Sequence, residues 1–198
     1  MLTDRFAEAL TYAERLHRKQ TRKGNDIPYV AHLMAVSATV LEWGGDEDIA
    51  IAALLHDAVE DQGGVDTLRE IEARFGGRVA GIVMGCTDST SSDLAAKAPW
   101  EERKRHHVAE LAQASLDIAL VTAADKLHNL TAMIRDVRKH GPATMGRFNA
   151  KPERLLWYFA SITSALRQHR DSVPADEIQS GVETLASLLG LKAPAPAL

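Results

Sequence analysis

Cysteine is nearly absent from this sequence, since Cys86 is the only one among 198 residues. A single cysteine cannot build an internal disulfide framework, and it cannot supply the set of thiolates that a structural zinc site needs. The scarcity of cysteine fits a reducing compartment, so we expect a cytoplasmic protein.

Long apolar runs and a strong excess of one charge are also missing. The longest apolar run, Ile49 to Leu55, is far shorter than the roughly 20 residues that span a bilayer. The first five residues do not form the apolar core of a signal peptide. The formal net charge of −4 disfavours general binding to nucleic acids or membrane surfaces. We therefore expect a soluble protein with small-molecule partners, no nucleic acid and no membrane.

Aromatic residues make up only 5% of the chain, and alternating runs of Val, Ile and Thr are scarce. Apolar residues instead recur every three or four positions, which is typical of helices. With 45% hydrophobic residues the chain can bury one sizeable core. The sequence predicts an all-α bundle of about eight to ten helices, with residues 1–190 as a single domain and residues 191–198 as a flexible tail.

Glycine pairs, prolines and polar stretches divide the helical pattern into segments. The expected helices span residues 4–19, 28–43, 48–61, 67–75, 79–86, 100–113, 116–139, 148–169 and 174–189. The Ser-rich stretch from Thr87 to Ala98 is expected to be a mobile loop that could cover a site. Apolar residues on the last helix leave a homodimer possible.

The segment from residue 52 to residue 61 has an unusual polar side. At about 100° per residue, a single helix would gather His56, Asp57, Glu60 and Asp61 in one arc of roughly 140°. No Lys or Arg follows at a helical spacing to neutralise these acids. A divalent cation such as Mn²⁺, Fe²⁺ or Zn²⁺ would do so, because imidazole and carboxylate together ligate these ions. The His-Asp dipeptide alone is weak evidence.

Other polar side chains point toward the interior of the predicted bundle. His32 lies on the apolar stripe of its helix, and so does His17, for which a core histidine is favoured over a ligand. Asp125 follows the apolar run from Ile118 to Ala124. An unpaired buried carboxylate costs on the order of several kcal/mol, so Asp125 should meet a cation or a metal.

The order of these candidates, a histidine, then the His-Asp pair, then an aspartate, resembles that of the HD-domain metal-dependent phosphohydrolases. Within them the chain is most similar to the single-domain relatives of the Rel/Spo hydrolase domain, the small alarmone hydrolases of the Mesh1 type. The motifs that carry the resemblance are RKGNDIPYVAH at 22–32, ALLHDAVED at 53–61, the passage from Phe75 to Asp88, and AADKLHN at 123–129.

The resemblance implies a role for each matching residue. The implied metal ligands, usually holding Mn²⁺, are His32, His56, Asp57 and Asp125. Glu60 and Asp61 match the acidic pair that activates the attacking water. The implied nucleotide contacts are Arg22, Lys23, Asn129 and, more loosely, Lys97, Arg103 and Tyr158. From the residues alone, Arg22 and Lys23 could be a solvated turn, Lys97 and Arg103 a solvated surface, and Tyr158 core packing.

The activity implied by the resemblance is removal of the 3′-pyrophosphate from a guanosine alarmone such as ppGpp, giving GDP and pyrophosphate. Leu33, Gln62 and Thr131 depart from the family pattern next to the pocket and leave the nucleotide open. The alternatives are a phosphatase acting on NADPH or another nucleotide, and a non-catalytic nucleotide sensor.

Overall fold

The computed structural model describes residues 1–88 and 98–194 of the chain. Within these residues all the regular structure is helical, apart from an isolated bridge between Thr21 and Pro28. The α-helices are α1 (Asp4–His17), α2 (Val30–Glu42), α3 (Glu47–Leu55), α4 (Ala58–Asp61), α5 (Gly64–Phe75), α6 (Gly77–Cys86), α7 (Trp100–Leu111), α8 (Leu116–His140), α9 (Pro152–Leu166) and α10 (Ala175–Leu188), with 3₁₀ turns η1 (Pro142–Arg147) and η2 (Arg167–Ser172). The prediction of an all-α fold is confirmed.

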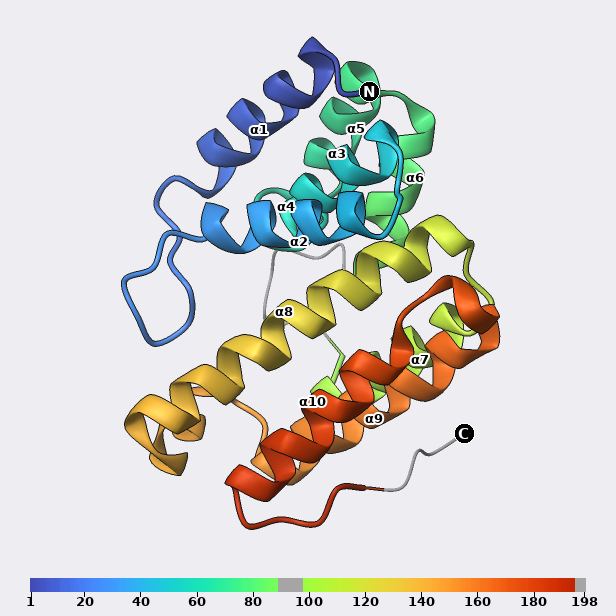
Figure 1. Ribbon diagram of the computed structural model, residues 1–198. Coiled ribbons are helices and arrows are strands. Elements are labelled where there is room, and N and C mark those ends of the chain that lie inside the picture. Colours follow the sequence, from blue (N-terminus) through green and yellow to red (C-terminus); the bar gives the residue numbers. More distant parts are fainter. Residues whose placement is uncertain (89–97, 195–198) are drawn as a thin grey trace.

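The helices pack in two groups around α8, which runs as a long diagonal between them in Figure 1. On one side, α1 to α6 enclose a core that includes Leu33, Ile51 and Leu55. On the other side, α7, α9 and α10 enclose a second core that includes Ile162 and Ile178. Because α8 contributes apolar side chains to both cores, its polar residues are held at the boundary between the two groups.

Short polar side chains fix where several helices begin. The Asp46 carboxylate accepts a hydrogen bond from the Ile49 amide at the start of α3, and Ser115 Oγ accepts one from the Ile118 amide at the start of α8. Such caps satisfy amides that have no partner inside the helix. They set the register of α8, which carries Asp125, and of α3, which leads into His56 and Asp57.

The predicted single helix over residues 48–61 is wrong. The chain leaves α3 after Leu55, turns through His56 and Asp57, and restarts as the short helix α4. His56 Nδ1 donates a hydrogen bond to the Ala53 carbonyl oxygen at 2.8 Å, a side-chain bond of the kind that competes with the helical ladder. The side chains of His56 and Asp57, which are adjacent in the sequence, lie together at this turn, with His56 Nε2 3.1 Å from Asp57 Oδ2.

The connection from α1 to α2 is a loop that crosses to α8. Gly24 adopts a positive φ of 78° in this loop, a conformation that side chains other than glycine rarely take. Arg22 reaches α8, where its Nη2 donates a hydrogen bond to Asn129 Oδ1 at 2.5 Å. The loop therefore closes one side of the space beside α8.

Among the described residues, none of the helices has the length and apolar character needed to cross a membrane.

Candidate metal centre and the cleft around it

Four side chains from three parts of the chain meet at the boundary between the two helix groups. His32 comes from the first turn of α2, His56 and Asp57 from the turn between α3 and α4, and Asp125 from the middle of α8. His32 Nε2 lies 3.2 Å from Asp125 Oδ1, and His56 Nε2 lies 3.1 Å from Asp57 Oδ2. Ligand atoms of His32, His56 and Asp57 all lie within 4.8 Å of one another. The structure thus brings all four predicted ligands together.

The two histidines are held with the same nitrogen directed into the cluster. His56 Nδ1 bonds to the Ala53 carbonyl, and His32 Nδ1 lies 2.7 Å from His128 Nδ1. The Nε2 atoms of His32 and His56 are buried and have no hydrogen-bond partner within the described part of the chain. A hydrogen bond to one ring nitrogen fixes the tautomer and leaves the other nitrogen available as a ligand.

The electrostatics of the cluster call for a positive charge. Burial raises the pKa of Asp125, but Lys126 and the two histidines outweigh it and hold the pKa well below its usual range. Burial lowers the pKa of His56, but the carboxylates of Asp57 and Asp125 outweigh it and raise the pKa well above its usual range. The two carboxylates thus favour positive charge at this point of the cluster, and a divalent ion would supply it.

Two buried imidazole nitrogens facing two carboxylate oxygens fit a divalent transition-metal ion, because this donor set leaves coordination positions open. The profile of a family described as "HD domain" matches residues 9–147. The chain belongs to the HD-domain family. Membership implies a divalent metal, and the residues present suit one. In this HD domain, His32, His56, Asp57 and Asp125 are the side chains that would hold it.

Known proteins similar to this HD domain include guanosine-3′,5′-bis(diphosphate) 3′-pyrophosphohydrolases called MESH1. The protein from Drosophila melanogaster is 38% identical over 142 residues, which cover 70% of this chain and 72% of that protein. The protein from Danio rerio is 37% identical over 131 residues, covering 65% of this chain and 68% of that protein.

Solved structures also share the architecture. One, described as a metazoan orthologue of SpoT that hydrolyses ppGpp, aligns with a TM-score of 0.71 and 31% identity, covering 97% of this chain and 99% of that one. A protein from Listeria monocytogenes EGD-e aligns with a TM-score of 0.66 and 28% identity, covering 77% of this chain and 96% of that one. The HD fold therefore extends over nearly the whole chain.

The acidic pair of the HD domain lies next to the candidate ligands. Glu60 and Asp61 end the short helix α4 and line the same cavity as Asp57 and Asp125. Gln20 Nε2 donates a hydrogen bond to Asp61 Oδ2 at 2.8 Å. Carboxylates at this position can accept a proton from water or hold it in place.

This cavity has a volume of about 200 Å³ and mixes acids with cations. Lys126 Nζ lies 2.5 Å from Asp125 Oδ2, and Lys104 forms an ion pair with Asp88. Both ammonium groups stand over the ring of Tyr158, at 5.0 Å for Lys104 and 5.7 Å for Lys126. Lys104 and Lys126 thus place two positive charges among the acids of this cavity, where they can contact an anionic group such as a phosphate.

The remaining predicted contacts divide between the cavity and its rim. Tyr158 lines the cavity, although this residue is only 5% exposed and belongs to the second core. Arg103 lies at the rim, where its Nη1 bonds Asp88 Oδ1 and lies 4.0 Å from Glu60 Oε1. Lys97 lies outside the described residues.

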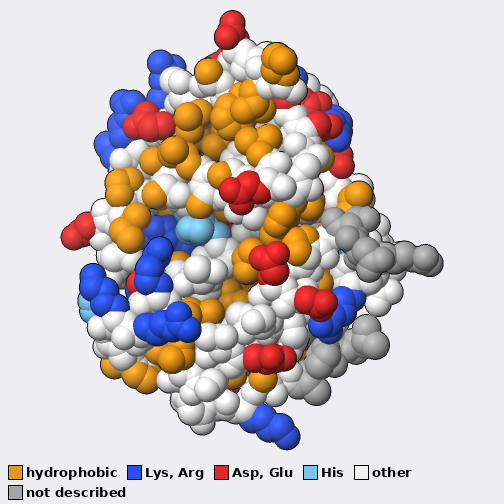
Figure 2. Space-filling model, in the orientation of Figure 1, with side chains coloured by type: hydrophobic (Ala, Val, Ile, Leu, Met, Phe, Trp, Pro, Cys, Tyr) orange, Lys and Arg blue, Asp and Glu red, His pale blue; other side chains and the backbone are white. Residues whose placement is uncertain are grey.

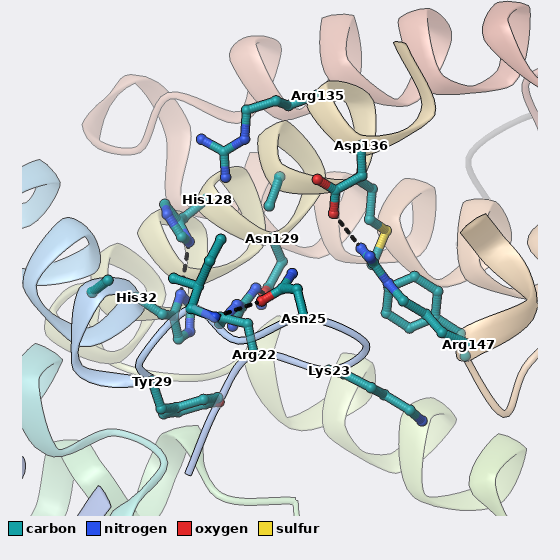
Figure 3. Close-up of a pocket in the computed structure, with 15 residues that line it drawn as sticks. Arg22, Lys23, Asn25, Tyr29, His32, His128, Asn129, Arg135, Asp136 and Arg147 are labelled. Carbon is teal, nitrogen blue, oxygen red and sulfur yellow. Dashed lines mark hydrogen bonds and ion pairs between the residues drawn. The ribbon is translucent and has the colours of Figure 1, made fainter. Parts of the chain in front are cut away.

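A second cavity, of about 450 Å³, opens on the other side of His32. Figure 3 shows Arg22 and Lys23 on the loop below it and Asn129 on α8. Arg22, Lys23 and Asn129 therefore line one space, as the resemblance implies. On the face of the molecule drawn in Figure 2, a histidine side chain lies in a hollow, and Lys and Arg side chains gather beside it.

Sequence reasoning missed the partners of the ligands. Tyr29 donates a hydrogen bond to Asp57 Oδ2 at 2.5 Å, His128 meets His32, and Lys126 pairs with Asp125. All three belong to the motifs that carried the resemblance, and His128 follows Asp125 at a helical spacing of three. That spacing was the available signal for His128. The sequence predicted a cation or a metal beside Asp125 without naming a residue, and Lys126 supplies a cation there.

Proposed function

We propose that this protein is a metal-dependent 3′-pyrophosphohydrolase that converts guanosine-3′,5′-bis(diphosphate) and water to GDP and pyrophosphate, with Mn²⁺ as its metal. The observation that carries the proposal is the position of the four-residue cluster between two cavities that share Tyr29 and Asn129. The similarity to MESH1 proteins from two animals supports the same reaction.

The two cavities differ in size and charge, which supports an orientation for the substrate. The larger cavity, with Arg22, Lys23 and Asn129, takes the nucleoside and its 5′-diphosphate. The smaller cavity, with Lys104 and Lys126, takes the 3′-diphosphate beside the candidate ligands. The volume of about 450 Å³ lies within the range of roughly 300 to 1,000 Å³ that is common for small-molecule sites.

The chain's own residues supply the proton transfer. Glu60 or Asp61 takes a proton from a water whose oxygen forms a bond to the phosphorus attached to the ribose O3′. The bond between that phosphorus and O3′ breaks, and O3′ leaves as the 3′-hydroxyl of GDP after taking up the proton that the acidic pair received from the water. General-base assistance of this kind contributes about 10²- to 10⁴-fold to the rate.

Charge stabilisation comes from the cations that line the smaller cavity. Lys104 and Lys126 stand over the ring of Tyr158 in this cavity and bind the pyrophosphate as negative charge shifts onto it. His32, His56, Asp57 and Asp125 are the residues that would hold a divalent ion, which would supply Lewis acidity toward water and phosphoryl oxygens.

The proposal is tested with purified protein that has been stripped of metal and reloaded with Mn²⁺, Fe²⁺ or Zn²⁺. The metal content and the release of GDP and pyrophosphate from ppGpp are measured on the same sample. We expect one metal per chain, pyrophosphate release that depends on metal, and the highest turnover with Mn²⁺. Metal binding without any release of pyrophosphate would refute the hydrolase and favour a nucleotide sensor.

The same assay includes NADPH and nucleoside monophosphates as competing substrates, with inorganic phosphate as the readout. Faster release of phosphate from NADPH than of pyrophosphate from ppGpp would replace the proposed substrate. The cytoplasmic location and the homodimer stay predictions from the sequence.

A further inference from the structure

The larger cavity extends along α8 well beyond the candidate metal cluster. Asn129, Met133 and Asp136 follow one another on successive turns of α8, and all three line the cavity. From Asp125 to Asp136 the helix rises about 16 Å, at about 1.5 Å per residue. A substrate that binds with its reacting group at the cluster and extends along α8 in this cavity would have its far end on the Asp136 side.

An ion pair closes that far end. Arg147 Nη2, from η1, lies 2.5 Å from Asp136 Oδ2, and the two side chains are 19% and 17% exposed. Figure 3 shows this pair across the cavity from His128. The hydrogen bond that joins the two side chains uses only Arg147 Nη2 and Asp136 Oδ2, so Nη1 and Oδ1 have no hydrogen bond within the described part of the chain, whereas Arg147 Nε is buried away from the cavity. The pair thus retains one acceptor oxygen and one donor nitrogen that are unused among the described residues.

Arg147 is held in place by its neighbours. Its guanidinium carbon lies 4.9 Å from the centre of the Phe148 ring, a stacked arrangement. Its side chain also crosses directly over Gly24, where a Cβ atom would lie only 2.5 Å from Arg147 Cδ. The absence of a side chain at Gly24 allows this approach, so the guanidinium has little freedom to turn away from the cavity.

We infer that Asp136 and Arg147 recognise the base of the substrate and select guanine over adenine; this inference rests on the proposed function. Guanine presents the O6 and N7 acceptors and, beside them, N–H donors at N1 and N2. A carboxylate next to a guanidinium offers the matching set, with Asp136 Oδ1 accepting from the base and Arg147 donating to it. Met133 and Ala132 line the same stretch of the cavity and supply the apolar surface on which a purine can lie.

Adenine reverses this pattern. Its 6-amino group would face the Arg147 donors, and its N1 acceptor would face the Asp136 carboxylate. A matched bidentate contact to a base discriminates by about 1 to 3 kcal/mol, which corresponds to a factor of about 5 to 150. We expect the wild-type protein to prefer guanosine nucleotides by a factor of this size.

The central variant is Asp136→Asn. An asparagine keeps an oxygen that can accept from Arg147, but it replaces the other oxygen with an amino group that opposes N1–H and N2–H of guanine. The kcat/KM values for ppGpp and for the adenosine analogue with the same two diphosphates are measured with Mn²⁺-loaded protein. We expect the ratio of guanosine to adenosine to fall by about 5- to 150-fold, through KM rather than kcat.

The matched control is Asp117→Asn. Asp117 lies on α8 outside both cavities, and its Oδ2 is 2.8 Å from Nη2 of Arg78, so the variant alters an Asp–Arg ion pair of the same kind. Its base preference should equal that of the wild-type protein. A second variant, Arg147→Lys, removes the planar donor while keeping the charge and should shift the ratio in the same direction as Asp136→Asn.

Binding of GDP and ADP, measured by calorimetry on the same proteins, keeps this inference separate from the hydrolysis itself. If the wild-type protein hydrolyses neither alarmone, the proposed function fails, while a preference for GDP that is lost in Asp136→Asn still supports base recognition. Equal binding of GDP and ADP by the wild-type protein overturns the inference. So does an equal loss for both nucleotides in Asp136→Asn, which would mean that the pair only braces η1 against α8.

Discussion

Tyr29 donates its phenolic hydrogen to Asp57 Oδ2 at 2.5 Å, and its ring stacks on the ring of His17 with centroids 5.2 Å apart. His17 is itself fixed by a hydrogen bond between its Nδ1 and Gln20 Oε1 at 2.7 Å. Burial, together with the nearby Asp57 carboxylate, raises the pKa of Tyr29 well above its usual range, so the hydroxyl stays a donor. The end of α1 thereby orients a candidate ligand that lies forty residues further along the chain.

Replacing Tyr29 with phenylalanine should weaken metal binding without unfolding the protein. The variant loses only the hydrogen bond that orients Asp57, and losses of this kind typically reduce metal affinity by about 10- to 100-fold. Calorimetric titration of the stripped protein with Mn²⁺ measures the change. Tyr12→Phe, which removes a buried hydroxyl in the first core, is the control, and an equal loss of affinity in both variants would contradict this role for Tyr29.

Glu60→Gln and Asp61→Asn should each retain the metal, and at least one of them should lose turnover. We expect kcat to fall by about 10²- to 10⁴-fold in at least one of them, because a neutral amide cannot take a proton from water. Pyrophosphate release and metal content are measured together. The control is Asp66→Asn, on α5, where the side chain is 89% exposed, and this variant should be as active as the wild-type protein. Full activity in both the Glu60 and the Asp61 variant would rule out either residue as the general base.

Lys126→Met should destabilise the metal-free protein more than the metal-loaded protein. The variant leaves the Asp125 carboxylate buried without its ammonium partner, and breaking a buried pair in this way costs about 3 kcal/mol. A bound divalent ion also neutralises Asp125 and should recover part of this loss. Urea unfolding with and without Mn²⁺ measures both values, and Lys139→Met, at the exposed end of α8, provides the control.

His107 should make the protein less stable as the pH falls from 6.5 toward 4. Burial, together with Lys126 and Lys104, lowers the pKa of His107 to about 3, against the nearby carboxylates of Asp88 and Asp125. In this window the unfolded chain binds a proton at His107 that the folded chain does not, so stability rises with pH by up to about 1.4 kcal/mol per unit.

The difference in unfolding free energy between the wild-type protein and His107→Gln isolates this contribution. Both proteins are measured without metal at pH 4.5 and at pH 7. Relative to the wild-type protein, the variant should be more stable at pH 4.5 than at pH 7 by on the order of 2 kcal/mol. A difference that does not depend on pH would show that His107 carries a proton in the folded protein.

The helical architecture was predictable because local rules determine it. Gly44-Gly45 and Gly63-Gly64 interrupt the apolar periodicity, and α2, α8 and α10 end within two residues of their predicted bounds. The break after Leu55 was not predictable from periodicity. There the His56 side chain bonds to a main-chain carbonyl inside a buried turn, and periodicity carries no information about such a bond.

The candidate ligands could also be named from the sequence, since His32, His56, Asp57 and Asp125 are ionisable groups in apolar surroundings that demand a partner. Their convergence, the orientation of each imidazole, and the division of the cleft into two cavities depend on how the helix groups pack on α8. The pairing of Asp136 with Arg147 likewise required the loop that returns after α8 to pass over Gly24. The sequence by itself determined which groups need a cation, because burial of charge is costly anywhere. Only the tertiary structure decided which groups meet, because contacts between distant segments follow from packing rather than from spacing along the chain.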